Sequence, residues 1–160
     1  ESDGVHVDHA YLGLTDGAAS LDGTKDVIWT GTDGGVVERR ITSDVAWDRG
    51  DRHVEATSER TMSFLDWGGG PTQRIQIDGD RDWESPNGAF HLEIDGVELR
   101  LVDPVPQDGS YTLTLPSGKD LSLAFARVDQ DTIEVTVAGP SRSRVFHVTS
   151  AGGVSDMGEA

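Results

Sequence analysis

From about Val27 onward, apolar and polar residues alternate with a period of two along most of the chain. In one stretch Val54, Ala56, Met62 and Phe64 share one parity, and the residues between them are mostly charged or hydroxyl-bearing. Such alternation is typical of antiparallel strands with one buried and one solvated face. It predicts strands at residues 26–33, 36–47, 52–66, 72–83, 88–94, 97–102, 110–115, 119–127, 132–138 and 143–149.

Turn-forming residues separate these stretches. Asp95-Gly96 lies between two alternating runs and predicts a two-residue hairpin turn. Asp33-Gly34-Gly35 and Pro116-Ser117-Gly118-Lys119 predict two further hairpins. Connections this short favour an all-β, antiparallel up-and-down meander of about ten strands over crossover topologies. The pattern leaves open whether the strands form a sandwich or a strongly curved open sheet; a closed β-barrel is the alternative.

The N-terminal segment, residues 1–25, has a different pattern. Ala10, Tyr11 and Leu14 fall at helical spacing, and Asp8 is a suitable N-cap residue. This spacing predicts a short helix, with an irregular arm as the alternative. Residues 150–160 form a Gly-rich polar tail, which we expect to contribute little to the core. The chain therefore reads as a single domain over 1–160, with the meander at 26–149.

Charge and composition exclude several classes of protein. The 160 residues include 29 acidic and 13 basic side chains, a formal charge of −16. Nucleic-acid binding normally needs a basic face, so DNA and RNA are not expected partners. The same charge argues against docking on anionic membrane surfaces. No apolar run approaches the roughly 20 residues of a membrane span, and without cysteine there are no disulfides, thiolate metal sites or cysteine nucleophiles.

The run from Trp29 through Gly31 to Gly35, followed by Thr/Ser-alternating strands to Ser63, resembles uncharacterised β-meander lipoproteins and secreted proteins of Gram-negative bacteria. The resemblance covers residues 26–149 and implies a non-catalytic surface protein with no assigned active site. The lipidated cysteine of such lipoproteins is not in this sequence. The chain begins at Glu1 rather than Met, which favours a trimmed or processed chain. We therefore expect an extracytoplasmic location: periplasmic, cell-surface or secreted.

One acidic cluster suits a hard cation. Asp78, Asp80, Asp82 and Glu84 occupy every second position, so on a strand they share one face. Calcium takes six to eight oxygen ligands, and closely spaced carboxylates supply several of them. The EF-hand pattern is not met. A solvated acidic turn without any cofactor is the preferred interpretation of this cluster, and a calcium site formed by these four residues is the alternative.

Histidines offer a second candidate metal group and no clear catalytic one. His6-Val7-Asp8-His9 places two imidazoles and a carboxylate within four residues, a set that suits a transition metal; a polar arm is the alternative. His53, His91 and His147 lie singly on predicted strands. The sequence has no nucleophile elbow, phosphate-binding loop or dinucleotide fingerprint. We therefore expect no enzymatic activity, although a spatial Ser-His-Asp arrangement stays open.

The four tryptophans divide into two pairs. Trp29 and Trp47 fit inner strand faces and are expected in the core. Trp67 and Trp83 end strands near Gly- or Pro-containing turns, where they either contact a partner or a sugar, or cap the core.

The preferred function is an extracytoplasmic structural or adhesive surface protein. Open sheet edges recruit neighbouring strands, so a filament or pilus-like subunit that self-associates through its edges, or that donates its N-terminal arm, follows naturally. Two alternatives remain: a ligand-binding β-barrel of lipocalin type, and an extracytoplasmic hydrolase.

Overall fold

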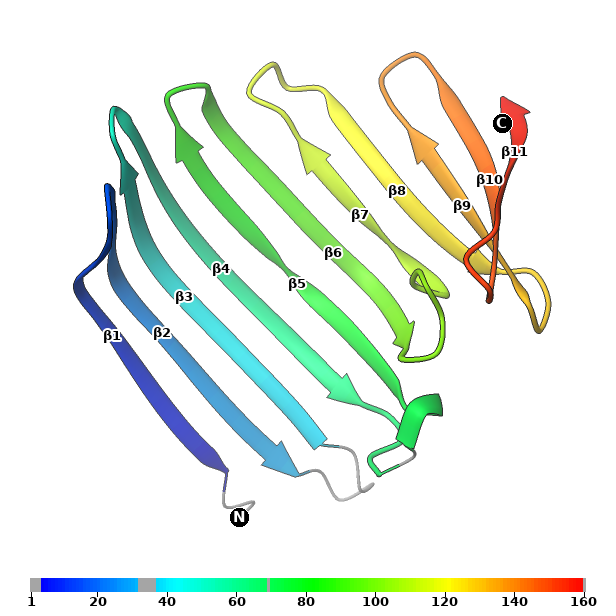
Figure 1. Cartoon of the computed structure of the whole chain (residues 1–160), viewed down its shortest axis with the longest axis horizontal. Helices are drawn as coiled ribbons and strands as arrows, with labels where there is room; N and C mark the ends of the chain where they lie inside the picture. The colour runs from blue at the N-terminus through cyan, green and yellow to red at the C-terminus, as the bar shows by residue number, and fades with distance from the viewer. Residues whose placement is uncertain (1–3, 32–36, 69, 160) are drawn as a thin grey trace.

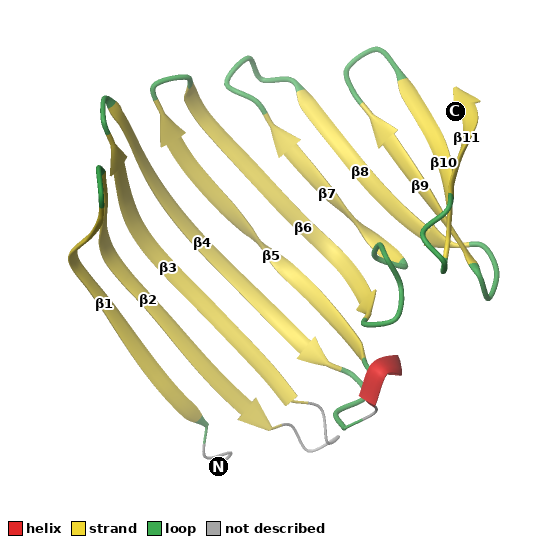
Figure 2. Cartoon of the chain, in the orientation of Figure 1, coloured by secondary structure: helices red, strands yellow, loops and turns green. Residues whose placement is uncertain are grey.

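Strands fill almost the whole chain. The computed structural model describes residues 4–31, 37–68 and 70–159 (Figures 1 and 2). Each strand pairs antiparallel with its neighbours in the chain, in the order β1 to β11, within one sheet. The elements are β1 (Val5–Asp16), β2 (Ala19–Gly31), β3 (Val37–Arg49), β4 (Arg52–Phe64), the 3₁₀ turn η1 (Gly70–Thr72), β5 (Arg74–Ser85), β6 (Gly88–Arg100), β7 (Asp108–Thr114), β8 (Asp120–Arg127), β9 (Thr132–Ala138), β10 (Ser143–Thr149) and β11 (Val154–Glu159).

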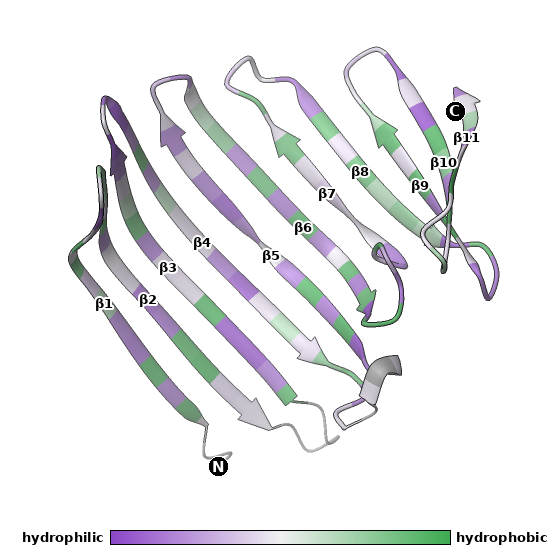
Figure 3. Cartoon of the chain, viewed as in Figure 1, coloured by the Kyte–Doolittle hydropathy of each residue, from purple (hydrophilic) through white to green (hydrophobic). Residues whose placement is uncertain are grey.

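The predicted all-β antiparallel meander is confirmed, and among its variants the structure is the open sheet. The sheet does not close, because β1 and β11 lie at its opposite ends (Figure 1). The closed barrel is therefore wrong for this chain, and so is a sandwich of two sheets. Apolar and polar residues alternate along the strands, as Figure 3 shows.

The N-terminal helix is a wrong prediction, because residues 5–31 form the β1–β2 hairpin. The register explains the error. Between Tyr11 and Leu14 the chain advances three residues while β2 advances two, from Gly23 to Leu21. This bulge puts Tyr11 and Leu14 on the same face of a strand, and their spacing imitates a helical turn. Gly13, at φ 60°, occupies the bulge and donates its N–H to Asp22 Oδ1 at 2.6 Å.

The hairpin predicted at Asp95-Gly96 is also wrong, because β6 runs without interruption from Gly88 to Arg100. Gly96 has φ 56°, and the β6–β7 register shifts between Asp95 and Glu98, so the dipeptide makes a bulge inside one strand. Gly109 allows the close approach there, since a Cβ on it would lie 2.4 Å from the Gly96 backbone. The hairpin predicted at Asp33-Gly34-Gly35 lies outside the described residues.

The register defines two faces of the sheet. One side of the sheet, which we call the apolar face, carries the buried hydrophobic residues. These are Val27, Ile41, Ala56, Phe64, Ile94, Val97, Phe125, Ile133, Val135 and Val148. The opposite side, which we call the acidic face, carries Asp26, Glu59, Asp80, Glu93 and Glu134.

The best-covered part of the apolar face lies over β8–β10. Phe125, Ile133, Val135 and Val148 form a buried cluster there, and Val105 from the β6–β7 loop packs against it. The polar tail predicted at residues 150–160 contains β11, whose side chains are mostly exposed.

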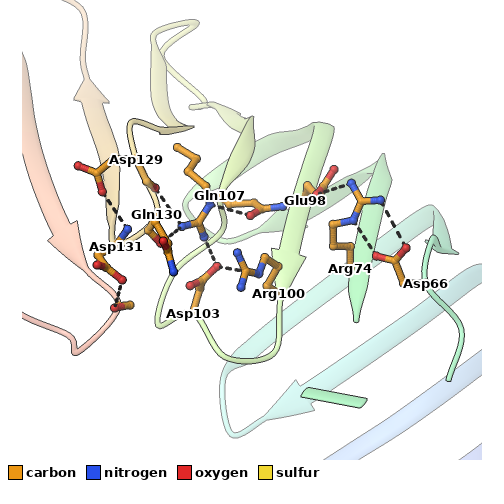
Figure 4. A network of polar contacts seen from close by, with 11 residues as sticks. Asp66, Arg74, Glu98, Arg100, Asp103, Gln107, Asp129, Gln130 and Asp131 are labelled. Carbon is orange, nitrogen blue, oxygen red and sulfur yellow. Dashed lines mark hydrogen bonds and ion pairs between the residues drawn. The ribbon is translucent and has the colours of Figure 1, made fainter. Parts of the chain in front are cut away.

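Polar contacts fix the loop that carries Val105 (Figure 4). Arg127 pairs with the carboxylate of Asp103, which is only 3% exposed, and its Nε donates to Gln107 Oε1 at 2.8 Å. A second Arg127 nitrogen donates to the Gln130 carbonyl at 2.9 Å. Arg100 Nε lies 3.6 Å from the same Asp103 carboxylate. One guanidinium thus ties the β6–β7 loop to the β8–β9 turn, at one end of the sheet.

Candidate binding face

Charged side chains are sorted between the two faces by sign. On the apolar face of β2–β9, every charged residue is a cation: Lys25, Arg39, Arg49, Arg52, Arg60, Arg81 and Arg127. The acidic face of the same strands carries mainly carboxylates. The formal charge of −16 is a total over the whole chain, and it does not reveal that one side of the sheet is cationic.

Two arginines of the apolar face rest on aromatic rings. The Arg39 guanidinium carbon lies 5.3 Å from the Trp29 ring centroid, and Trp29 stacks on Phe64 at 5.6 Å. The Arg39 Nε is buried and has no hydrogen-bond partner. Arg81 repeats the arrangement at 5.8 Å from the ring centroid of Trp83. Cation–π contacts of this kind orient the guanidinium while leaving most of its donors unused.

The second aromatic stack pairs Trp83 with Phe90, whose centroids lie 5.1 Å apart at an interplanar angle of 4°. Trp47 lies on the same face, half-buried. Trp29 and Trp47 lie on the apolar face, as their strand parity predicts, but both are half-buried and neither belongs to the buried core. Trp67 is 58% exposed and meets Phe64 edge-on.

Arg60 on β4 reaches across the apolar face. Burial raises the pKa of Tyr111 on β7, and the positive charge of Arg60 opposes that rise. The two side chains therefore interact although β5 and β6 lie between their strands. Arg60 is itself exposed, so its charge remains available to a ligand.

The total exposed surface of the chain is large for its mass, as expected when neither face of the sheet has a covering layer. The chain exposes 9,922 Å², whereas a compact monomer of 17.2 kDa exposes about 7,800 Å². The excess of about 2,100 Å² is of the size that one partner buries in a large protein interface. A one-layer sheet has no second layer to cover its apolar side, which accounts for the difference.

A groove of about 620 Å³ opens over β8–β10 on the apolar face. Leu121, Val137 and Phe146 form its apolar wall, and Arg142 and Arg144 add positive charge. Arg144 Nη1 lies 3.3 Å from a carboxylate oxygen of Asp156, so that charge is partly neutralised.

The residues of the predicted calcium cluster all lie on β5 and on the acidic face. Asp78 accepts hydrogen bonds from the Gly96 N–H at 2.8 Å and from Gln76 Nε2 at 3.0 Å. An extended strand separates Asp78 from Glu84 by about 20 Å, too far for all four carboxylates to bind one ion. Calcium binding stays a prediction, and any ion would be held by neighbouring carboxylates only.

A shallow hollow of about 530 Å³ lies beside this row. It is floored by small residues such as Ala46, and its carboxylates include Asp44, Glu55, Asp82 and Glu84. Glu55 and Glu84 are direct cross-strand partners. Like charges in that position repel, so the hollow is electrostatically suited to cations.

The predicted His6–Asp8 pair lies on the acidic face of β1, and β2 adds a third group. His6 Nε2 lies 2.5 Å from Asp26 Oδ1 and 3.3 Å from Asp8 Oδ1. These ligand atoms all lie within 4.8 Å of one another. His9 falls on the opposite face by strand alternation. Asp26 could not be assigned from the sequence, because the β1–β2 register depends on the bulge.

Histidines on the acidic face pair with carboxylates across neighbouring strands. His53 Nδ1 lies 2.7 Å from Asp48 and its Nε2 3.2 Å from Glu55. Hydrogen bonds that the imidazole donates to Asp48 and to Glu55 raise the pKa of His53. His91 pairs with Asp82 at 2.8 Å, and His147 lies 3.4 Å from Glu134.

Comparisons with known proteins give no relatives. No protein-family model matches the chain, and neither the curated proteins nor the solved structures contain a significant match. The resemblance to β-meander lipoproteins therefore stays a prediction. Within residues 4–31, 37–68 and 70–159, no helix has the length and apolarity needed to cross a bilayer.

Proposed function

We propose that this chain is a non-catalytic structural or adhesive protein that associates with copies of itself through edge strand β1. The observation that carries the proposal is the length and exposure of that strand. β1 has 12 residues, and β2 is its one neighbour in the sheet. A long edge strand offers its outer row of backbone N–H and C=O groups to another chain.

The side chains of β1 support the same conclusion. Val5 is 62% exposed and Leu14 59%, although both lie on the apolar face, where the next strands bury Val27 and Ile41. An added strand at the Val5 end of β1 would cover Val5 and continue the apolar face. The opposite edge suits pairing less well, because β11 has six residues and its register with β10 shifts at Val145.

A two-fold pairing centred on Val7, which aligns residues 5–9 of β1 in the two copies, is chemically favourable. It sets His6 of one copy opposite Asp8 of the other, twice, on the acidic face. Opposite charges in cross-strand positions stabilise a sheet. Two-fold interfaces are also the commonest kind in homo-oligomers.

The test uses the absence of cysteine from the sequence. Val7→Cys should cross-link two copies under mild oxidation, because the centre of a two-fold antiparallel pair faces itself. Ser117→Cys, at an exposed turn, is the matched control and should not cross-link. Val7→Lys should shift the parent's size-exclusion peak to the monomer by setting two cations face to face. A parent that stays monomeric at high concentration, with no Val7→Cys dimer, would contradict the proposal.

An extracytoplasmic location belongs to the same proposal. It rests on the resemblance of residues 26–149 to secreted β-meander proteins, which is itself a prediction from the sequence. Fractionation of the source cell with an antibody against the native sheet would test it. Recovery in the cytoplasmic fraction would contradict it.

A further inference from the structure

We propose that the apolar face of β2–β6 binds an amphiphile with a negatively charged headgroup and a long hydrocarbon chain. This site is independent of edge pairing at β1, since it uses a face of the sheet rather than its edge. The argument rests on the sign of the charges, the arrangement of the arginines and the apolar surface beside them.

The arginines form a diagonal row. Arg39 on β3 stands opposite Met62, Arg60 on β4 stands opposite Gly79, and Arg81 follows two residues further along β5. Arg60 and Arg81 are exposed. In β2–β9 no carboxylate shares this face with them, so an anionic headgroup would meet three guanidinium groups and no like charge. Arginine binds carboxylates and phosphates through paired N–H donors.

An apolar strip continues from this row toward the β3–β4 turn. Small side chains line its middle, where Ser43 and Ser58 hydrogen-bond at 2.8 Å beside buried Ala56. Larger apolar side chains flank it, namely Val45, Trp47, Val54, Trp83 and Phe90. From Arg60 to Val54 the strand covers about 20 Å, which is comparable with an extended acyl chain.

Charge argues against a second copy as the occupant, and the occupied rings of Trp29 and Trp83 make a sugar less favourable than an amphiphile. A second copy placed face to face would set Arg60 and Arg81 against the same cations, and like charges without partners oppose burial. A sugar needs an open aromatic ring face, but Trp29 already carries Phe64 and Arg39. Trp83 likewise carries Phe90 and Arg81. An aliphatic chain needs only exposed apolar area, which this face supplies in excess.

The experiment compares ligands on the parent chain by calorimetry and tryptophan fluorescence. Laurate below its micellar concentration is the main probe, with acetate as the headgroup without a chain and dodecanol as the chain without a charge. We expect laurate to bind and to alter the fluorescence of Trp47 and Trp83. Acetate should not bind, and dodecanol should bind at least about tenfold more weakly.

Charge reversal locates the site. Arg60→Glu with Arg81→Glu should weaken laurate binding at least about tenfold. Arg40→Glu is the matched control, because Arg40 is exposed on the opposite face and pairs with Glu59 at 2.5 Å; it should leave the affinity within about twofold. If circular dichroism shows that the double variant does not fold, Arg60→Gln replaces it, and the ligand series on the parent stands unchanged.

Four results would overturn the proposal: equal binding of laurate and dodecanol, equal losses in the two charge-reversal variants, a loss caused instead by Arg142→Glu in the β8–β10 groove, or no laurate binding. Binding of polygalacturonate without laurate would assign the face to acidic polysaccharides. Binding to phosphatidylglycerol vesicles alone would assign it to membrane surfaces. Either outcome contradicts a site for single amphiphiles, and none of these results bears on the Val7→Cys test of edge pairing.

Discussion

Replacing Ile133 by alanine tests where the stability of this one-layer sheet resides. Ile133 is 1% exposed and lies on the apolar face of β9, opposite Val148. The change removes three carbons, each of which contributes about 0.8 kcal/mol when buried. The Val105 loop is held by the Arg127 contacts and cannot settle fully into the space, so a cavity term adds to this. We expect a loss of about 3–4 kcal/mol.

Val137→Ala is the matched control, because Val137 lies on the same strand and face but is 44% exposed. It removes two carbons that are about half buried, which corresponds to about 1 kcal/mol. Urea denaturation followed by circular dichroism measures both, with an unchanged m-value showing that unfolding still exposes the same surface. Equal losses in the two variants, or a loss below about 1 kcal/mol for Ile133→Ala, would refute the idea that β8–β10 form the stabilising centre.

Four further outcomes follow from the structure. Gly79→Ala should destabilise the sheet strongly and lower the urea midpoint, because Gly79 has φ 141° and a Cβ there would lie 2.1 Å from the Glu59 carbonyl oxygen. The raised pKa of His53 gives stability that is present below its unfolded pKa of about 6.5 and is lost as the pH rises through the folded value. Proton NMR should therefore show a lower His53 pKa in Asp48→Asn, and the fall of the melting temperature above neutral pH should be smaller in that variant. Sodium chloride should raise the melting temperature, since a Debye length of about 3 Å at 1 M screens the carboxylates of the acidic face; a falling melting temperature would contradict this. At constant high ionic strength calcium should stabilise more than magnesium, and Asp80→Asn with Asp82→Asn should abolish the difference.

Most of the sheet could be predicted because strand alternation is a local property of the sequence. The errors fall where one extra residue enters a strand. At Leu12-Gly13 a bulge changes the parity and imitates helical spacing, and at Asp95-Gly96 a bulge uses the same residues as a hairpin turn. Only the partner strand distinguishes these cases. Gly109 lets the β7 backbone approach Gly96 closely, but nothing in the sequence links position 109 to position 96.

The cations of the candidate binding face could have been predicted from strand alternation, but the negative net charge pointed away from them. Arg60 has the same parity as Ala56 and Phe64, and Lys25 has the same parity as Val27, so alternation already places these cations on the apolar side. The charge total of −16 suggested instead that anionic partners are unfavourable. The His6–Asp26 contact is different, because it needs the β1–β2 register and could not have been found from one strand.

The separation of charge places a carboxylate-rich surface on one side of the one-layer sheet and an apolar, cationic surface on the other. Glu59, Asp80 and Glu93 stand opposite one another on three adjacent strands, an arrangement that costs stability through repulsion. Arg40 relieves part of that cost by pairing with Glu59. The same carboxylates prevent two sheets from stacking through their acidic faces, because such stacking would bury like charges. The two proposed associations, at the β1 edge and on the apolar face, avoid this burial of like charges, and Arg60 and Arg81 suit the proposed ligand that is both apolar and anionic.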